Sequence, residues 1–238
     1  MPFLNFKVEV TVRNLTKTQP PEVLAQSAAT WTAEFIADST SKAKRFKYRH
    51  PDIKKSLLSE TGSKCVYCES KVGHNTPGDV EHKLPTASNP GLHFDWSNLT
   101  IACTVCNTRK NAYDDSSQPF LDPYNDNVEQ LVVHYGPIVG WQSASLRGEK
   151  TVRVLGLHDN SRTEVIARKI EKLCELNEVV SRRAHERDPV MRELLIHRIE
   201  EMQQRNAEFS AMVVSVFRSA VSVLDAETNP SVTTPSAS

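Results

Sequence analysis

The sequence has no excess of charge of either sign and no long apolar run. Its 238 residues include 29 Lys and Arg and 29 Asp and Glu, so the whole chain has no long-range field that attracts a polyanion. Any contact with nucleic acid must therefore be local. A membrane-spanning helix needs roughly 18 or more apolar residues in a row, and no stretch approaches that length. These absences argue against a membrane protein and favour a folded chain of one large or two small domains.

The first twelve residues lack the basic start and apolar run of a secretory signal. We therefore expect a cytoplasmic protein, in a reducing compartment where disulfides are rare. In that setting, paired cysteines are interpreted first as metal ligands. Four of the five cysteines form two C-x-x-C pairs, Cys65 with Cys68 and Cys103 with Cys106.

The alternative for a C-x-x-C pair is a thioredoxin-like redox site, but that motif occurs singly, before a helix in a βαβ unit. Two matched pairs predict one tetrahedral site in which four thiolates hold Zn²⁺. A full set of thiolates leaves no open coordination position, so this zinc is expected to be structural. The fifth cysteine, Cys174, lies in a later helical pattern and is expected to be a small core residue.

The N-terminal region reads as structural, with one basic segment. Residues 5–13 alternate apolar and polar positions, which predicts a strand, and residues 22–37 show the 3 and 4 spacing of a helix. Residues 42–55 hold seven Lys and Arg against one acid, Asp52. Such a run either grips phosphates or forms a solvated helix face, and both interpretations stay open here.

Three motifs lie between and just after the cysteine pairs: D-V-E-H-K-L-P at residues 79–85, W-S-N-L at residues 96–99 and N-T-R-K at residues 107–110. In this order and spacing they resemble the HNH endonuclease family, whose active site is a ββα-metal hairpin and helix. The resemblance implies four catalytic residues: His82 as the general base on the attacking water, Glu81 and Asn107 as ligands of a catalytic cation, and Asn98 as the brace of the loop that carries the base.

These residue types suit phosphodiester hydrolysis. A neutral imidazole with a pKa near about 6.5 can take a proton from water at neutral pH. Mg²⁺ or Mn²⁺ held by carboxylate and amide oxygens can neutralise the charge that develops on the phosphate. One difficulty is that adjacent strand residues face opposite sides, so Glu81 and His82 cannot both point at Asn107 unless the strand ends there. Pro85 suggests that it does.

Each of these residues also has a structural alternative. His82 could be a surface or core histidine, Asn98 a plain turn former, and Asn107 a cap of the second cysteine pair. Intact Glu81 and His82 at the family spacing favour the catalytic interpretation.

Three basic residues of the same region, Lys83, Arg109 and Lys110, could hold phosphates of the cut strand or lie in solvent, and we expect phosphate contact. Asp79 and His93 lie nearby but match no role that the chemistry requires.

The C-terminal half begins with two strand-like runs, LVVHY and PIVGW, followed by TVRVLGL. Ser161 to Glu164 is a capping box that predicts a helix to about residue 184. Asp188 and Pro189 are an N-cap and N1 pair for a second helix, with apolar positions as far as Val221. These helices either pack on one another or offer a surface to a partner. The tail from Glu227 is expected to be disordered.

Together the patterns predict an α+β fold: a ββα-metal HNH core stapled by a four-cysteine zinc site, with an N-terminal helix and long C-terminal helices. We expect four parts. Residues 1–60 form an N-terminal strand and helix with the basic run, and residues 61–157 form the nuclease core with the strands that follow it. Residues 158–226 form the C-terminal helices, and residues 227–238 form the tail.

The resemblance covers about two thirds of the chain, from P-P-E-V-L near residue 20 to V-L-G-L at residues 154–157. Over that span the sequence is similar to the HNH subunit of Septu-type bacterial anti-phage systems, also found beside some retrons. This implies an effector nuclease, with DNA as the favoured substrate, and an ABC-type or SMC-like ATPase partner of the PtuA type bound through the C-terminal helices. The rival functions are a zinc-stabilised module that binds nucleic acid without cutting it and an interaction subunit with a relic hairpin.

Overall fold

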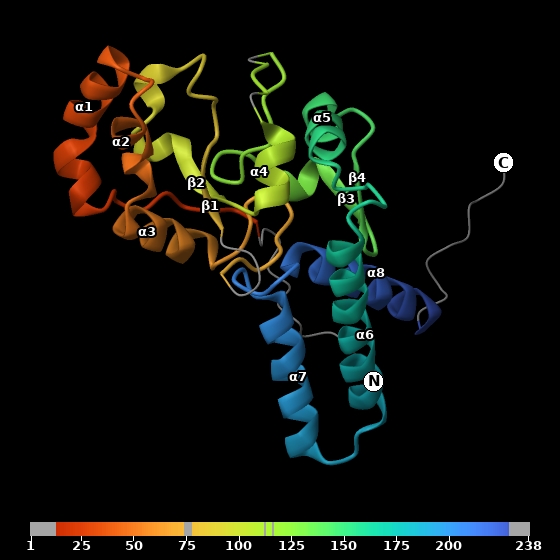
Figure 1. Ribbon diagram of the computed structural model, residues 1–238. Coiled ribbons are helices and arrows are strands. Elements are labelled where there is room, and N and C mark those ends of the chain that lie inside the picture. Colours follow the sequence, from red (N-terminus) through yellow and green to blue (C-terminus); the bar gives the residue numbers. More distant parts are fainter. Residues whose placement is uncertain (1–12, 74–77, 112, 116, 229–238) are drawn as a thin grey trace.

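The computed structural model describes residues 13–73, 78–111, 113–115 and 117–228, with side chains as far as residue 220. A mixed body of helices and two small hairpins carries a helical arm that projects from it (Figure 1). The strand predicted at residues 5–13 lies almost wholly outside the described residues. Within them, no helix combines the length and apolar character that crossing a membrane requires.

The N-terminal helices cover one side of the first hairpin. Helix α1 spans Glu22–Ala37, as predicted, and buries Leu24 and Phe35. The basic run forms α2 (Lys42–Arg45), the 3₁₀ helix η1 (Phe46–Arg49) and the start of α3 (Pro51–Thr61). Pro51 at the first position and the His50 side chain, which accepts from the Asp52 N–H, begin α3.

The hairpin and the helix after it form the predicted ββα unit. Strands β1 (Asp79–His82) and β2 (Leu99–Ala102) pair antiparallel, with Glu81 opposite Thr100 and His82 opposite Leu99. Helix α4 (Thr104–Lys110) follows at once, and α3 packs on β2. Three short 3₁₀ helices lie in the connections, η2 (Pro90–Leu92), η3 (Trp96–Asn98) and η4 (Val128–Gln130). The α+β fold expected from the sequence is confirmed.

The two later runs form a second hairpin, β3 (Val132–Tyr135) and β4 (Ile138–Trp141), as predicted. The next segment is helix α5 (Leu146–Leu155), which the sequence analysis did not anticipate. Ser145 caps it, because its hydroxyl accepts from the Gly148 N–H, and Gly156 ends it with a φ of 59°. The helix buries Thr151, Val152 and Leu155.

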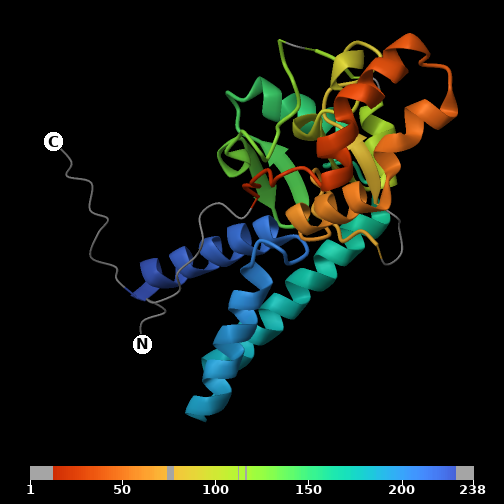
Figure 2. The ribbon, with the colours of Figure 1, turned by 90° about the vertical axis from the view of Figure 1, so that its left-hand side faces the viewer.

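The C-terminal helices form the arm. Helices α6 (Thr163–His185) and α7 (Pro189–Gln203) run side by side, and α8 (Ser210–Thr228) crosses their base (Figures 1 and 2). They bury their apolar faces mainly against one another. That small core consists of Leu176, Ile199, Met202, Phe209, Met212, Val213 and Phe217.

Three details of the arm differ from expectation. The capping box does not form, because Arg162 stands at the N-cap of α6 and no side chain caps the helix. The predicted second helix is two helices, divided where Phe209 adopts a φ of 55° with its ring buried. Cys174 is exposed on α6 and is not a core residue. The predicted N-cap at Asp188 is confirmed, since its carboxylate accepts from the Val190 N–H.

Candidate active site and metal centre

The four paired cysteines meet at one point. Their sulfur atoms all lie within 4.8 Å of one another, and all four side chains are buried. Tetrahedral coordination with Zn–S bonds near 2.3 Å separates the ligand sulfurs by about 3.8 Å, and the Cys68 and Cys103 sulfurs are 3.8 Å apart. The donor set and its spacing therefore fit a structural zinc. One pair precedes the hairpin and the other begins α4, so this metal would hold α4 to the chain before β1.

His82 ends β1 with its ring fixed in one orientation. Its Nε2 lies 2.9 Å from the carbonyl oxygen of His93. A carbonyl can only accept a hydrogen bond, so Nε2 carries the proton in the neutral ring and Nδ1 keeps its lone pair. Burial lowers the pKa of His82 to about 4, with the His93 carbonyl raising it and Lys110 and Arg45 lowering it. The imidazole is therefore neutral at pH 7.

A column of rings supports His82. His93 stacks on it with centroids 4.7 Å apart, and Phe35 stacks on the other side of His93 at 3.9 Å. The Tyr48 ring meets His82 edge-on at 4.6 Å. His93 is 1% exposed and its Nε2 lies 2.7 Å from the Arg45 carbonyl, to which it donates. No role for His93 was expected from its sequence, because its partners come from distant segments and no local pattern indicates them.

The acidic residues of β1 face α4 instead. Asp79 and Glu81 are two positions apart on one strand and so share a face. The Lys110 ammonium lies 2.7 Å from Glu81 Oε1 and donates to the His82 carbonyl at 2.8 Å. Asn107 Nδ2 donates to Asp79 Oδ2 at 3.4 Å. Burial raises the pKa of Glu81, and Lys110 partly offsets that rise.

The two cation ligands that the resemblance implied lie on elements that contact one another, Glu81 on β1 and Asn107 on α4. Asp79, for which the sequence predicted no role, contacts Asn107 directly. His82 projects from the other face of the strand, as the alternation of side chains requires.

Asn98 ties together the loop that follows His82. Its Oδ1 accepts from the Leu84 N–H at 2.8 Å, and its Nδ2 donates to the carbonyls of Leu84 at 3.1 Å and Leu92 at 3.2 Å. The side chain is buried. One amide thus joins both ends of the segment that also supplies the His93 carbonyl, which is the arrangement that a loop brace requires.

The basic residues expected to contact phosphates have other partners. Lys83 forms an ion pair with Asp122 at 2.7 Å, and Arg109 donates to Asp159 and Ser161. Lys110 is 3% exposed and held by Glu81. A buried, paired ammonium cannot reach a phosphate, so for Lys110 the expectation is corrected.

The basic run of residues 42–55 also contacts the surroundings of His82. Arg45 supplies the carbonyl that holds His93, and Tyr48 touches His82. Lys44 and Lys47 are paired with Asp38 and Glu34. The exposed cations of the run are Lys42, Arg45, Arg49 and Lys55.

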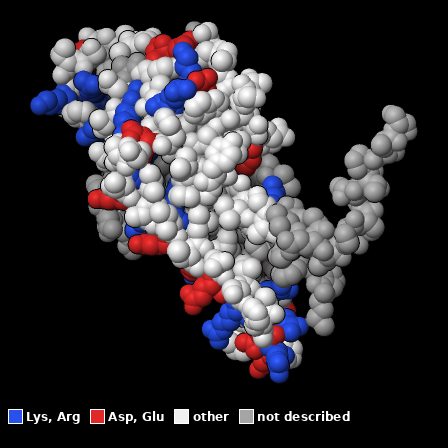
Figure 3. All heavy atoms as spheres, turned by 90° about the vertical axis from the view of Figure 1, so that its right-hand side faces the viewer, with Lys and Arg blue, Asp and Glu red and all other residues white. Residues whose placement is uncertain are grey.

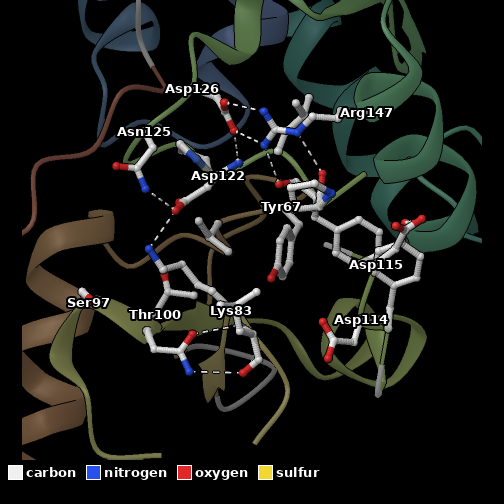
Figure 4. A pocket seen from close by; sticks show the side chains of 18 of the residues that line it. Tyr67, Lys83, Ser97, Thr100, Asp114, Asp115, Asp122, Asn125, Asp126 and Arg147 are labelled. Atoms are coloured by element: carbon white, nitrogen blue, oxygen red, sulfur yellow. Dashed lines mark hydrogen bonds and ion pairs between the residues drawn. The ribbon is translucent and has the colours of Figure 1, made fainter. Parts of the chain in front are cut away.

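A pocket of about 460 Å³ lies beside the loop after His82 (Figure 4). Its charged lining consists of four aspartates against one lysine and one arginine, and both cations are already paired, Lys83 with Asp122 and Arg147 with Asp126. This excess of acid repels a phosphate backbone. We therefore do not place the phosphodiester there.

Charge is also mixed on the face shown in Figure 3. Lys and Arg of the described residues are interspersed with Asp and Glu there, most visibly at the far end of the arm, and no continuous basic surface forms on that face. The equal totals of acids and bases in the sequence agree with this distribution.

Residues 65–112 match the model of the HNH endonuclease family. The matched span contains both cysteine pairs, the first hairpin and α4. The chain therefore contains an HNH endonuclease domain, which confirms the resemblance carried by its motifs.

The likeness extends beyond that domain. The chain is 28% identical over 216 residues to the Septu protein PtuB of Bacillus thuringiensis, an alignment that covers 85% of this chain and 80% of that protein. It is 28% identical over 163 residues to the Septu protein PtuB of Bacillus mycoides, covering 56% of this chain and 55% of that protein. The chain is thus a homologue of PtuB.

Proposed function

We propose that the protein is a metal-dependent endonuclease that hydrolyses phosphodiester bonds, and that its favoured substrate is DNA. One observation carries the proposal: the His82 Nε2 is fixed on the His93 carbonyl, which leaves a neutral ring whose Nδ1 lone pair has no hydrogen-bond partner among the described residues. A base in this state can accept the proton of an attacking water. It occupies the family's position at the end of β1, next in the chain to Glu81, and its ring packs against Tyr48 of the basic run.

The chain's own groups fit a divalent cation on that face. Asp79 and Glu81 offer carboxylates and Asn107 an amide oxygen, all of them oxygen ligands of the kind Mg²⁺ prefers. Glu81 Oε1 is buried and accepts no hydrogen bond from the described residues, although Lys110 pairs with it electrostatically. When bound, the cation would neutralise charge developing on the phosphate. Lys110 holds the His82 backbone, and Asn98 holds the loop behind it.

A magnesium titration of cleavage tests this face. We expect Asn107→Ala and Asp79→Asn to raise the Mg²⁺ concentration for half-maximal cleavage by about tenfold or more, because each removes an oxygen from the ligand set. Asp52→Asn, an exposed acid on α3, serves as the matched control. Unchanged magnesium dependence in Asn107→Ala would remove this face as the cation site. Plasmid DNA and RNA should both be offered, with the protein alone and co-expressed with any ATPase encoded beside it.

The exposed cations of the basic run are expected to hold the substrate backbone. In Arg45→Ala/Arg49→Ala we expect KM to rise about tenfold with little change in kcat, and the slope of log affinity against log salt to fall by about 1.8, or roughly 0.9 for each lost phosphate contact. The Arg45 carbonyl that holds His93 survives both substitutions. Lys44→Ala/Lys47→Ala is the control, since those amines are already paired. Equal effects from both double variants would show that general charge, and not this contact, is responsible.

The PtuB relatives support a role in a Septu-type anti-phage system, with this chain as the effector nuclease and a PtuA-type ATPase as its partner. The equal numbers of acids and bases suit a nuclease whose affinity for nucleic acid is supplied by an assembly. The arm is the proposed contact, since Val190 and Leu194 are 67% and 55% exposed near its far end. Co-purification with the neighbouring ATPase, lost when these two residues become Ser, would support it. A protein that stays monomeric when co-expressed with its neighbour would count against this partner.

A further inference from the structure

Arg162 joins the arm to the cysteine cluster. It stands directly before α6 and is 6% exposed. One terminal nitrogen, NH1, lies 3.3 Å from the Cys106 sulfur, and the other, NH2, lies 3.9 Å from the Cys103 sulfur. NH1 also lies 3.4 Å from the Leu155 carbonyl at the end of α5. A buried guanidinium therefore has two of the four cysteine sulfurs as its main partners.

We propose that Arg162 is a positioning residue for the zinc centre, donating hydrogen bonds to the zinc-bound thiolates of Cys103 and Cys106, and that the metal thereby fastens the helical arm to the nuclease domain. The inference rests on the zinc site alone and is independent of whether the domain cuts nucleic acid. It extends the role of the metal from the ββα unit to the C-terminal third of the chain.

The charges favour this arrangement. Zn²⁺ with four thiolates carries a net charge of about −2, and hydrogen bonds to thiolates are stronger than those to neutral thiols. Arg162 is always protonated and offers five N–H donors, so it can serve two sulfurs at once. The metal would also fix the Cys103 and Cys106 sulfurs beside the guanidinium, and without it nothing holds the four sulfurs at one point. Removal of the metal should therefore loosen the start of α6.

A second contact joins the same two parts. Arg109, on α4, donates to the Ser161 hydroxyl at 2.8 Å and to Asp159 at 3.3 Å. Its guanidinium lies so close to Gly156 that a Cβ there would stand 1.4 Å from NH1. The connection between α5 and α6 thus contacts α4 through Arg109 and the cysteine cluster through Arg162. Because α4 also carries Asn107, the arm and the proposed cation site share one support.

The first test measures zinc release from the full-length, zinc-loaded protein into excess chelator, without substrate. We expect Arg162→Gln to release zinc about 10-fold to 100-fold faster than wild type, the range typical of lost partners of metal ligands. Arg162→Lys keeps the charge but not the two-pronged geometry, so an intermediate rate is expected. Arg168→Gln is the control and should match wild type, because Arg168 lies, as an exposed side chain, on the same helix and pairs with Glu208 instead of the sulfurs.

Hydrogen exchange distinguishes a fastening role from a simple loss of stability. With zinc bound, Arg162→Gln should exchange its amides faster than the wild type at residues 156–166, while α1 and α3 stay protected. If Arg162→Gln does not fold, Arg162→Lys carries the same comparison. Wild-type zinc release by both Arg162 variants, with unchanged exchange at residues 156–166, would overturn the proposal, whatever their activity on DNA.

Discussion

His82→Ala is expected to lower the cleavage rate by about 10² to 10⁴, the usual contribution of a positioned general base, while zinc content and folding persist. The loss should fall on kcat, because the ring accepts a proton and does not hold the backbone of the substrate. His158→Ala, an exposed histidine after α5, is the matched control. Cutting by His82→Ala at the wild-type rate would remove His82 as the base, and zinc loss in that variant would assign it a structural role instead.

The dependence of the cleavage rate on pH is a second test of His82 as the general base. Burial holds the pKa of His82 at about 4, below the ordinary imidazole value of about 6.5. A depressed pKa keeps the base neutral as the pH falls, and a nearby cation would depress it further. At saturating Mg²⁺ the rate should therefore persist below pH 6 and decline only as the pH approaches the pKa of about 4. A decline centred near 6.5 would show that the ring is more exposed during catalysis than in this arrangement.

The second large effect concerns stability. Cys106→Ser is expected to abolish zinc binding and cooperative unfolding of the nuclease domain, because Cys106 is fully buried within the four-sulfur cluster. Structural zinc contributes about 10 to 16 kcal/mol of apparent binding free energy in small zinc-finger peptides. The effect here should be smaller, since the domain also has an apolar core, but still large enough to remove the folded state at ordinary temperature.

Cys174→Ser is the matched control for that experiment. Cys174 is exposed on α6 and lies outside the cluster. The zinc content and melting temperature of the Cys174→Ser variant should therefore equal those of the wild type. Metal analysis and thermal unfolding followed by circular dichroism provide the measurements. Stoichiometric zinc in Cys106→Ser, or a melting temperature equal to that of Cys174→Ser, would contradict the structural role of the metal.

Local sequence pattern predicted secondary structure correctly where the residues of one helix are enough to specify it. The spacing of residues 22–37 predicted α1, and the Asp188 and Pro189 pair predicted the start of α7. It did not predict the secondary structure of segments whose conformation depends on packing against other elements. The segment after the second hairpin became α5, because its buried positions follow a helical spacing that only contact with neighbouring elements reveals. The predicted long helix broke at Phe209 so that this ring could enter the core of the arm.

The sequence by itself determined the four cysteines that cluster, the hairpin, and the identity and order of the residues expected to be catalytic, because these depend on spacing along a few dozen residues. Only the tertiary structure decided what surrounds them. It placed His93 on His82, Lys110 on Glu81, and Arg162 on the cysteine sulfurs. Each of these contacts joins separate elements, and a buried charge or ring acquires its partner only when the chain packs. The proposed ligands of both metals are therefore close together in the sequence, whereas the residues that contact those ligands come from distant segments.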